Sequence, residues 1–136
     1  MDLDRARAFV REHHHAVMAT VRADGRPALS PVACGVDDAG RVVVSTRETA
    51  RKVAHVRRDP RVTLCVIDDA FYGTWVQVEG RAEVVSLPEA MEPLVAYYRS
   101  VSGEHPDWDE YRAAMAREQR VVVRIELDRA GPDVQG

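Results

Sequence analysis

Strand-like segments follow one another along this chain with only tight turns between them. The segments 16–21 and 27–36 flank the turn 23–26, and 41–46 follows the Asp-Asp-Ala-Gly turn at 37–40. Short apolar and β-branched runs separated by such turns predict antiparallel hairpins. A regular alternation of single strands and helices is absent, which excludes a doubly wound parallel sheet.

The rest of the chain adds three strand segments and four helical ones. We expect strands over 61–67, 74–85 and 120–127, and helices over 3–14, about 49–58, 88–101 and 107–118. Gly80 interrupts an alternating run and predicts a bulge or a close backbone approach. Six mostly antiparallel strands with a few inserted helices predict a mainly β fold, a small barrel with added helices. Residues 130–136 are expected to form a frayed tail.

The composition describes one folded domain of ordinary size. The chain has 136 residues, of which 46% are hydrophobic and 30% charged, so we expect a single domain over 1–136. No apolar run approaches the roughly 20 residues that span a bilayer, and the start lacks a signal-peptide pattern, which favours the cytoplasm and no membrane partner. A pI near 5.9 argues against nucleic-acid binding. Cys34 and Cys65 lack metal-ligand spacing and are expected to be buried, reduced thiols.

Cationic residues gather in the segment 47–61, where a strand leads into a helix. The segment holds six Lys or Arg and two Asp or Glu, a local charge of +4, whereas the rest of the chain carries −7 to give −3 overall. The backbone N–H groups and the dipole at a helix N-terminus add to this charge, so 49–52 is a candidate phosphate site. Ser45 and Thr46, at the end of the preceding strand, are candidate neutral donors.

A solvated helix face is the commonest alternative for a run of charges. We expect Arg57, Arg58 and Arg61 to have that role, because they lie at the far end of the helix, where their charge complements the dipole and faces solvent. Lys52 lies nearer to the strand end. The segment is therefore predicted to be part site and part surface, with Lys52 at the centre of the site.

Three stretches carry a resemblance to a known family. They are 19–32 (ATVRADGRPALSPV), Lys52 with 56–62 (VRRDPRV), and 78–82 (VEGRA). In this order and spacing they resemble the split β-barrel flavin-binding superfamily of pyridoxamine phosphate oxidase, and the resemblance covers the whole chain. It implies the FMN-binding split barrel, a six-stranded antiparallel barrel, as the fold of one cofactor-binding domain.

A narrower resemblance lies in the C-terminal third, in Tyr98-Arg99 and in 103–112 (GEHPDWDEYR). This part looks like the actinobacterial deazaflavin-dependent branch of the superfamily, which uses coenzyme F420 in place of FMN. The resemblance implies a homodimer with two equivalent cofactor sites at the subunit interface, where half of each pocket comes from the partner.

The same resemblance implies that Lys52 grips the cofactor phosphate, with Ser45, Thr46 and Arg51 beside it. Some relatives carry an arginine two residues before this lysine, where this chain has Ala50. Lys52 is therefore the principal phosphate contact that the resemblance implies.

A flavin or deazaflavin also needs an apolar slot for its flat ring beside the anion site. The backbone of Ser30, Pro31 and Val32 is a candidate to hydrogen-bond the ring edge, and Trp75 or Gln77 to border the ring. Barrel packing is an equal alternative for Trp75. No catalytic acid, base or nucleophile stands out, so the catalytic residues are left unassigned.

Three consecutive histidines at 13–15 invite a metal interpretation. Consecutive side chains diverge at the end of a helix, and no carboxylate or cysteine lies at a suitable spacing. We therefore expect solvated histidines and predict no metal site.

The leading hypothesis is a cytoplasmic, homodimeric oxidoreductase in which reduced F420 transfers a hydride to a small organic acceptor. One alternative keeps the fold and exchanges F420 for FMN, as in an oxidase or reductase of the pyridoxamine phosphate oxidase type. Another is a carrier or sensor that binds the cofactor without catalysis. One sequence leaves the identity of the acceptor open, because fold does not determine substrate.

Overall fold

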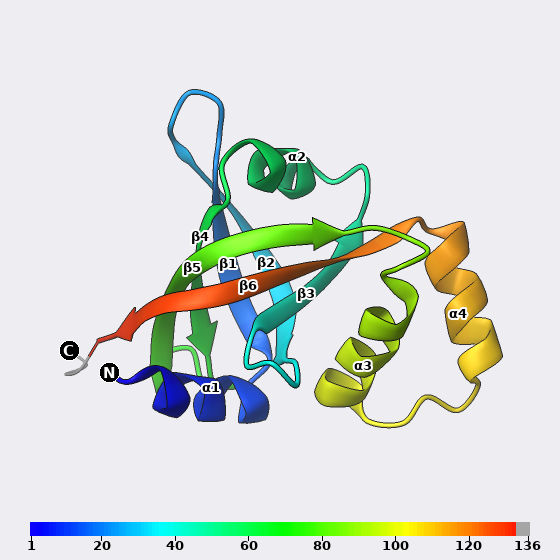
Figure 1. The fold of residues 1–136 in the computed structure, drawn as a ribbon. Helices are drawn as coiled ribbons and strands as arrows, with labels where there is room; N and C mark the ends of the chain where they lie inside the picture. Colours follow the sequence, from blue (N-terminus) through cyan, green and yellow to red (C-terminus); the bar gives the residue numbers. More distant parts are fainter. Residues whose placement is uncertain (133–136) are drawn as a thin grey trace.

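The structure, a computed structural model, describes residues 1–132 as a barrel with helices at both ends and along one side (Figure 1). Its elements in chain order are α1 (Leu3–Glu12), β1 (His15–Val21), β2 (Pro27–Val36), β3 (Val42–Arg47), α2 (Arg51–Arg58), β4 (Arg61–Ile67), β5 (Trp75–Val85), α3 (Met91–Ser102), α4 (Trp108–Arg117) and β6 (Arg120–Gly131). Within this part of the chain, none of the helices has the length and apolar character needed to cross a membrane.

The six strands close into a barrel in the order β1-β2-β3-β6-β5-β4, and every neighbouring pair is antiparallel. The mainly β, six-stranded antiparallel barrel predicted from the sequence is thereby confirmed. The bulge predicted at Gly80 is also confirmed, since the register of β5 against β6 shifts between Glu79 and Gly80. A Cβ at this position would collide with the carbonyl group of Glu126, so the close approach requires glycine.

Alternate residues of the strands fill the barrel interior, because successive side chains of a strand point to opposite faces. Met18, Leu64 and Ile125 are fully buried there. Helix α1 adds Val10 and helix α2 adds Val56 to the same core. In Figure 1 these two helices lie at opposite ends of the barrel, α1 below and α2 above.

A second apolar cluster fixes the C-terminal helices to the outer face of β3 and β6. Val43 and Val122 of these strands pack with Leu94 of α3, and Trp108 and Tyr111 of α4 complete the cluster. The Tyr111 hydroxyl donates a hydrogen bond of 2.8 Å to the carbonyl oxygen of Leu94. Figure 1 shows α3 and α4 together on this side, away from α2.

The helix boundaries differ from the prediction by up to three residues. Helix α1 ends at Glu12 because His13 has an extended backbone. Helix α2 begins at Arg51 because Ala50 is extended, and α3 begins at Met91, after a turn at 87–90.

The final strand is longer than the predicted 120–127. It continues to Gly131, and its residues Ala130 and Gly131 pair with Val78 and Gln77 of β5. The predicted tail is therefore wrong for residues 130 and 131, because β5 offers them a pairing edge. Residue 132 follows the strand without regular secondary structure, and residues 133–136 of the predicted tail lie outside the described residues.

Candidate functional site

Helix α2 follows strand β3 after a short turn and begins with an open, cationic amino end. Ala50 occupies the N-cap position with an extended backbone (φ −64°, ψ 141°), and no side chain caps the helix. The N–H groups of Arg51 and Lys52 therefore lack the intrahelical partner that later residues have. These N–H groups and the positive end of the helix dipole favour an anion here.

The six cations of the segment 47–61 divide into two groups. Four are engaged by acceptors of the protein itself: Arg47 by Glu118 at 3.4 Å, Arg57 by Glu48 at 2.7 Å, Arg58 by the carbonyl oxygen of Val21 at 2.7 Å and Arg61 by Asp59 at 2.6 Å. Within residues 1–132, the side chains of Lys52 and Arg51 have no ion pair or hydrogen bond. Two cations at the amino end of α2 are thus left for an anion.

The arginines at the carboxyl end of α2 are exposed, as expected, and they also bind acceptors of the protein itself. The Arg57 guanidinium donates to the Ser86 hydroxyl at 3.2 Å, and its hydrogen bond to Glu48 holds the pKa of that carboxyl below its usual value. Hydrogen bonds from Arg61 likewise lower the pKa of Asp59 to about 2. These pairings were not expected from the sequence, because the acceptors next to the helix in space are distant in sequence or follow its last turn.

A pocket of about 500 Å³ lies between the amino end of α2 and the β1–β2 hairpin. We call it the cationic pocket, and its walls include Lys52, Arg51 and His55 of α2 and Thr20, Leu29 and Ser30 of the hairpin. Among the described residues, no acidic side chain lines it. Lys52 is half-buried, and burial lowers the pKa of its ammonium group. The Oγ1 atom of Thr20 lies 2.9 Å from Nδ1 of His55, a hydrogen bond that ties α2 to β1.

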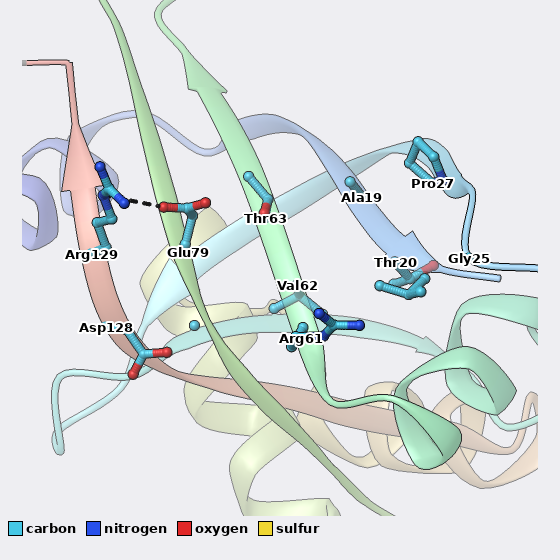
Figure 2. Close-up of a pocket in the computed structure, with 12 residues that line it drawn as sticks. Ala19, Thr20, Gly25, Pro27, Arg61, Val62, Thr63, Glu79, Asp128 and Arg129 are labelled. Carbon is cyan, nitrogen blue, oxygen red and sulfur yellow. Dashed lines mark ion pairs between the residues drawn. The ribbon is translucent and has the colours of Figure 1, made fainter. Parts of the chain in front are cut away.

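A second hollow of about 520 Å³ adjoins the cationic pocket and crosses β1, β4, β5 and β6. We call it the outer groove, and Thr20 and Pro27 line both hollows. Figure 2 shows Thr63 of β4 and, beside it, Glu79 of β5 in an ion pair of 3.7 Å with Arg129 of β6. The candidate anion site and the outer groove therefore share a wall, and the groove has the volume that small ligands occupy.

Sequence reasoning missed the outer groove and six of the residues that line the cationic pocket, among them Thr20 and His55. The alternation of exposed and buried residues along β4 and β5 was the available signal for the groove. The contact between Thr20 and His55 had no local signal, because 35 residues separate the two in sequence.

Three of the predicted site residues come together, since Lys52, Arg51 and Ser30 all line the cationic pocket. Ser45 and Thr46 do not line it. They are neighbours in β3, so their side chains point to opposite faces. Thr46 shares the buried face that fills the barrel, and Ser45 shares the face of Val43, which packs under α3.

The predicted ring-edge strand has an open backbone edge beside the cationic pocket. Strand β2 pairs with β1 over residues 27–33, but within the described chain it pairs with β3 only over residues 34–36. Ser30, Pro31 and Val32 lie in the part with one unpaired edge. Their side chains differ: Pro31 is exposed on the outer face, whereas Val32 packs against the core.

Trp75 and Gln77 lie at the other end of the barrel from the cationic pocket. Trp75 pairs with Ile67, which pairs with His15 at the first residue of β1. Thr20, in the wall of the pocket, is five residues further along β1, which corresponds to roughly 17 Å along a strand. Within one protomer, Trp75 and Gln77 therefore do not border the cationic pocket.

The histidines and cysteines do not form a metal centre in the part of the chain that the structure describes, where no group of three His, Cys, Asp or Glu is placed to hold an ion. The ring of His14 is half-buried, with Nδ1 2.8 Å from the carbonyl oxygen of Cys34, so the expectation of solvated histidines is wrong for this residue. Cys34 and Cys65 are free thiols; Cys34 is buried and Cys65 half-buried. Burial raises the pKa of Cys34 to about 12, which makes it a poor nucleophile.

Comparisons with known proteins agree with this geometry. The F420H2-dependent biliverdin reductase of Mycobacterium tuberculosis (strain CDC 1551 / Oshkosh) is 28% identical over 127 residues, which are 93% of this chain and 84% of the reductase. The crystal structure of the conserved hypothetical protein Rv2991 from Mycobacterium tuberculosis is similar with a TM-score of 0.77 and 29% identity, over 100% of this chain and 93% of that one.

A solved structure named F420 reductase is similar in fold, with a TM-score of 0.69 and 19% identity over 91% of this chain and 94% of that one. The sequence model of the family described as pyridoxamine 5'-phosphate oxidase matches residues 3–131. These residues include all six strands, the cationic pocket and the outer groove. The chain therefore belongs to the pyridoxamine 5'-phosphate oxidase family.

Proposed function

We propose that this protein is a cytoplasmic, homodimeric oxidoreductase that uses coenzyme F420 and transfers a hydride between the reduced cofactor and a small organic acceptor. The observation that carries the proposal is the pair of unpaired cations, Lys52 and Arg51, at the uncapped amino end of α2. Membership of the family supports an oxidoreductase with a cofactor of the flavin or deazaflavin class. The relative named F420H2-dependent biliverdin reductase supports the deazaflavin.

The residues of the cationic pocket fit the phosphate group of such a cofactor. Lys52 is half-buried and lacks a partner among the described residues, so a phosphate supplies the counter-charge that the fold does not. The N–H groups at the start of α2 and the hydroxyl of Ser30 are further donors. Arg51 is exposed, which places its charge at the rim of the pocket.

The protein groups in this proposal bind and orient, and none of them acts as a nucleophile. When bound in its reduced form, the cofactor supplies a hydride, which together with a proton from water reduces an acceptor by two electrons. Lys52 holds the phosphate end, and the open edge of β2 at Ser30, Pro31 and Val32 offers backbone groups to the ring edge. When both ends of the cofactor are held, its ring has a fixed position relative to the acceptor. Such positioning by itself lowers the activation barrier of hydride transfer.

A homodimer explains why the predicted site residues occupy two ends of one protomer. The outer face of the barrel between these ends carries partly exposed apolar side chains, with Val17 36% and Leu29 67% exposed. A second copy stacked on this face with its strands antiparallel would place its Trp75 and Gln77 near the cationic pocket of the first. Burial of the apolar side chains would stabilise that arrangement.

FMN is the alternative cofactor, because the family match favours it and both molecules carry a phosphate on the ribityl chain. F420 has in addition an acidic tail of glutamate residues. Arg51 in the wall of the cationic pocket favours that tail, because its side chain has no ion pair or hydrogen bond within residues 1–132. Arg22 also lines the pocket but forms an ion pair of 3.0 Å with Asp24. Arg47, another cation of the segment, is engaged by Glu118 and does not line the pocket.

A fluorescence titration of the purified protein with F420 tests the proposal. We expect saturable binding with one site per subunit, and an absence of binding would overturn the F420 assignment. Two flavin absorption bands in the freshly purified protein would favour FMN instead. Turnover of a reporter acceptor with reduced F420, abolished by Lys52→Ala, separates an enzyme from a non-catalytic carrier.

A further inference from the structure

Two large aromatic side chains at the tip of the β4–β5 loop are exposed to solvent. Phe71 is 76% exposed and Tyr72 is 96% exposed. Their rings contact each other edge to face, with centroids 5.0 Å apart. Exposed neighbouring aromatic rings leave a large apolar area in water, which is characteristic of a surface that contacts a partner or a ligand.

The loop that carries these rings is held in a defined shape. The carboxylate of Asp68 accepts hydrogen bonds from the N–H groups of Ala70 at 2.8 Å and Thr74 at 2.7 Å. The N–H group of Asp68 donates to the carbonyl oxygen of Thr74 at 3.1 Å. Gly73 packs so closely against the same carboxylate that a Cβ would not fit. Phe71 and Tyr72 are therefore presented on a pre-formed loop, which reduces the entropy cost of binding.

The cationic pocket lacks the aromatic surface that a flat ring uses for stacking. Its apolar walls come from Pro27, Ala28 and Leu29, and among the described residues no Phe, Tyr or Trp lines either this pocket or the outer groove. The eight aromatic residues of the sequence lie elsewhere. One is in α1, four are in α3 and α4, and the remaining three are Phe71, Tyr72 and Trp75 at the start of β5.

Within one protomer, the aromatic tip cannot reach the cationic pocket. The loop follows Ile67, which pairs with His15 at the first residue of β1, whereas Thr20 of the pocket lies near the last residue of that strand. These two ends are roughly 17 Å apart along the strand. A second copy whose outer face is stacked antiparallel on the first brings the loop end of one subunit against the α2 end of the other.

We propose that Phe71 and Tyr72 act across the homodimer and form the aromatic wall of the ring site whose phosphate is held by Lys52 of the other subunit. The inference rests on the proposed function, because it requires a cofactor with a flat ring. A two-fold dimer then contains two equivalent sites. Each site takes its cations from one subunit and its aromatic wall from the other.

The test uses dimers that combine two defective subunits. Lys52→Ala and the double variant Phe71→Ala/Tyr72→Ala are each purified and titrated with F420, and the fluorescence of the cofactor reports binding. Each is expected to lose affinity, the double variant by about ten-fold because stacked aromatic contacts are removed. The two subunits are then co-expressed with different affinity tags, and the doubly tagged dimer is isolated. Glu89→Ala, an exposed change outside both hollows, serves as the control that should not alter binding.

The mixed dimer distinguishes a wall contributed across the interface from one that acts within a subunit. If the wall acts across the interface, one of the two sites is intact, and the mixed dimer recovers one tight F420 site where wild type has two. If the double variant binds F420 as wild type does, or if the mixed dimer shows no tight site, this inference is overturned while the function proposal stands. If no doubly tagged dimer forms, this inference fails together with the homodimer of the proposed function, whereas F420 binding by wild type still supports the cofactor assignment. If wild type itself fails to bind F420, the proposed function fails and this inference fails with it.

Discussion

The two ends of helix α2 carry the same kind of charge but differ in what surrounds it. At the carboxyl end, Arg57 is bound by Glu48 and Arg58 by the carbonyl oxygen of Val21. At the amino end, Lys52 and Arg51 face a pocket without acidic side chains and have no partner within residues 1–132. A run of cations therefore does not by itself locate a site. The informative feature is a cation that lies beside a hollow and has no counter-charge from the rest of the protein.

The largest effect that this comparison predicts is at Lys52. Lys52→Met keeps most of the aliphatic stem and removes the charge, so the fold should be retained. A hydrogen bond to a charged group contributes about 2–3 kcal/mol, so the affinity for F420 should fall roughly 30- to 150-fold. Fluorescence titration measures this loss.

Arg58→Met at the other end of α2 is the matched control. It removes the same charge from the same helix but outside the cationic pocket. The affinity for F420 should stay within about two-fold of wild type, because Arg58 does not line the pocket and its guanidinium is already bound to the carbonyl oxygen of Val21. An equal loss in both variants would show that net charge, and not position at the amino end, governs binding.

Arg51→Ala should weaken F420 binding by a smaller factor. Arg51 is exposed at the rim of the pocket, and an exposed ion pair contributes about 0.5–1 kcal/mol, which corresponds to roughly two- to six-fold in affinity. Titrations at low and high salt should show this difference shrinking as ionic strength rises. A difference that does not depend on salt would place the guanidinium inside the pocket instead of at its rim.

The architecture was predictable from the sequence because its signals are local. The hairpin turns, the alternation in β5 and the glycine of the bulge each act over a few residues, and together they predicted six antiparallel strands. The placement of Lys52 and Arg51 at the start of a helix was also predictable from neighbouring residues. The pairing of Arg57 with Glu48 and of Arg58 with Val21 was not, because it depends on how the closed barrel places β1 and the β3–α2 turn around the helix.

Some of the predicted site residues do not line the cationic pocket of one protomer, because their positions depend on facing directions and on long-range register. Ser45 and Thr46 were assigned to one site because they are adjacent in sequence. The side chains of adjacent residues in a strand point to opposite faces of the sheet. Trp75 was placed beside the ring site without knowledge of its strand register. Its pairing with Ile67 puts it at the far end of the barrel from the cationic pocket.

Removal of Arg57 should affect stability and leave binding unchanged. Arg57→Ala breaks the contacts with Glu48 and Ser86, and the exposed position limits the loss to about 0.5–1 kcal/mol in the free energy of unfolding. Urea denaturation measures this change, and the F420 titration should match wild type. A weakened F420 affinity at unchanged stability would contradict the division between the two ends of α2.

The smallest expected effect is the acid titration of Asp59, just beyond the carboxyl end of α2. Hydrogen bonds from Arg61 lower the pKa of Asp59 from its ordinary value of 3.8 to about 2. Because the folded pKa is the lower one, ionised Asp59 stabilises the fold above pH 3.8, and this contribution is lost as the pH falls towards about 2. In Arg61→Ala, the pKa of Asp59 measured by carboxyl-carbon NMR should rise towards 3.8. An unchanged pKa would show that the backbone N–H of residue 61, and not the Arg61 guanidinium, stabilises the ionised carboxylate. Arg61 would then be a third cation without a bound acceptor, like Lys52 and Arg51. The two ends of the segment would in that case differ less in how their cations are bound.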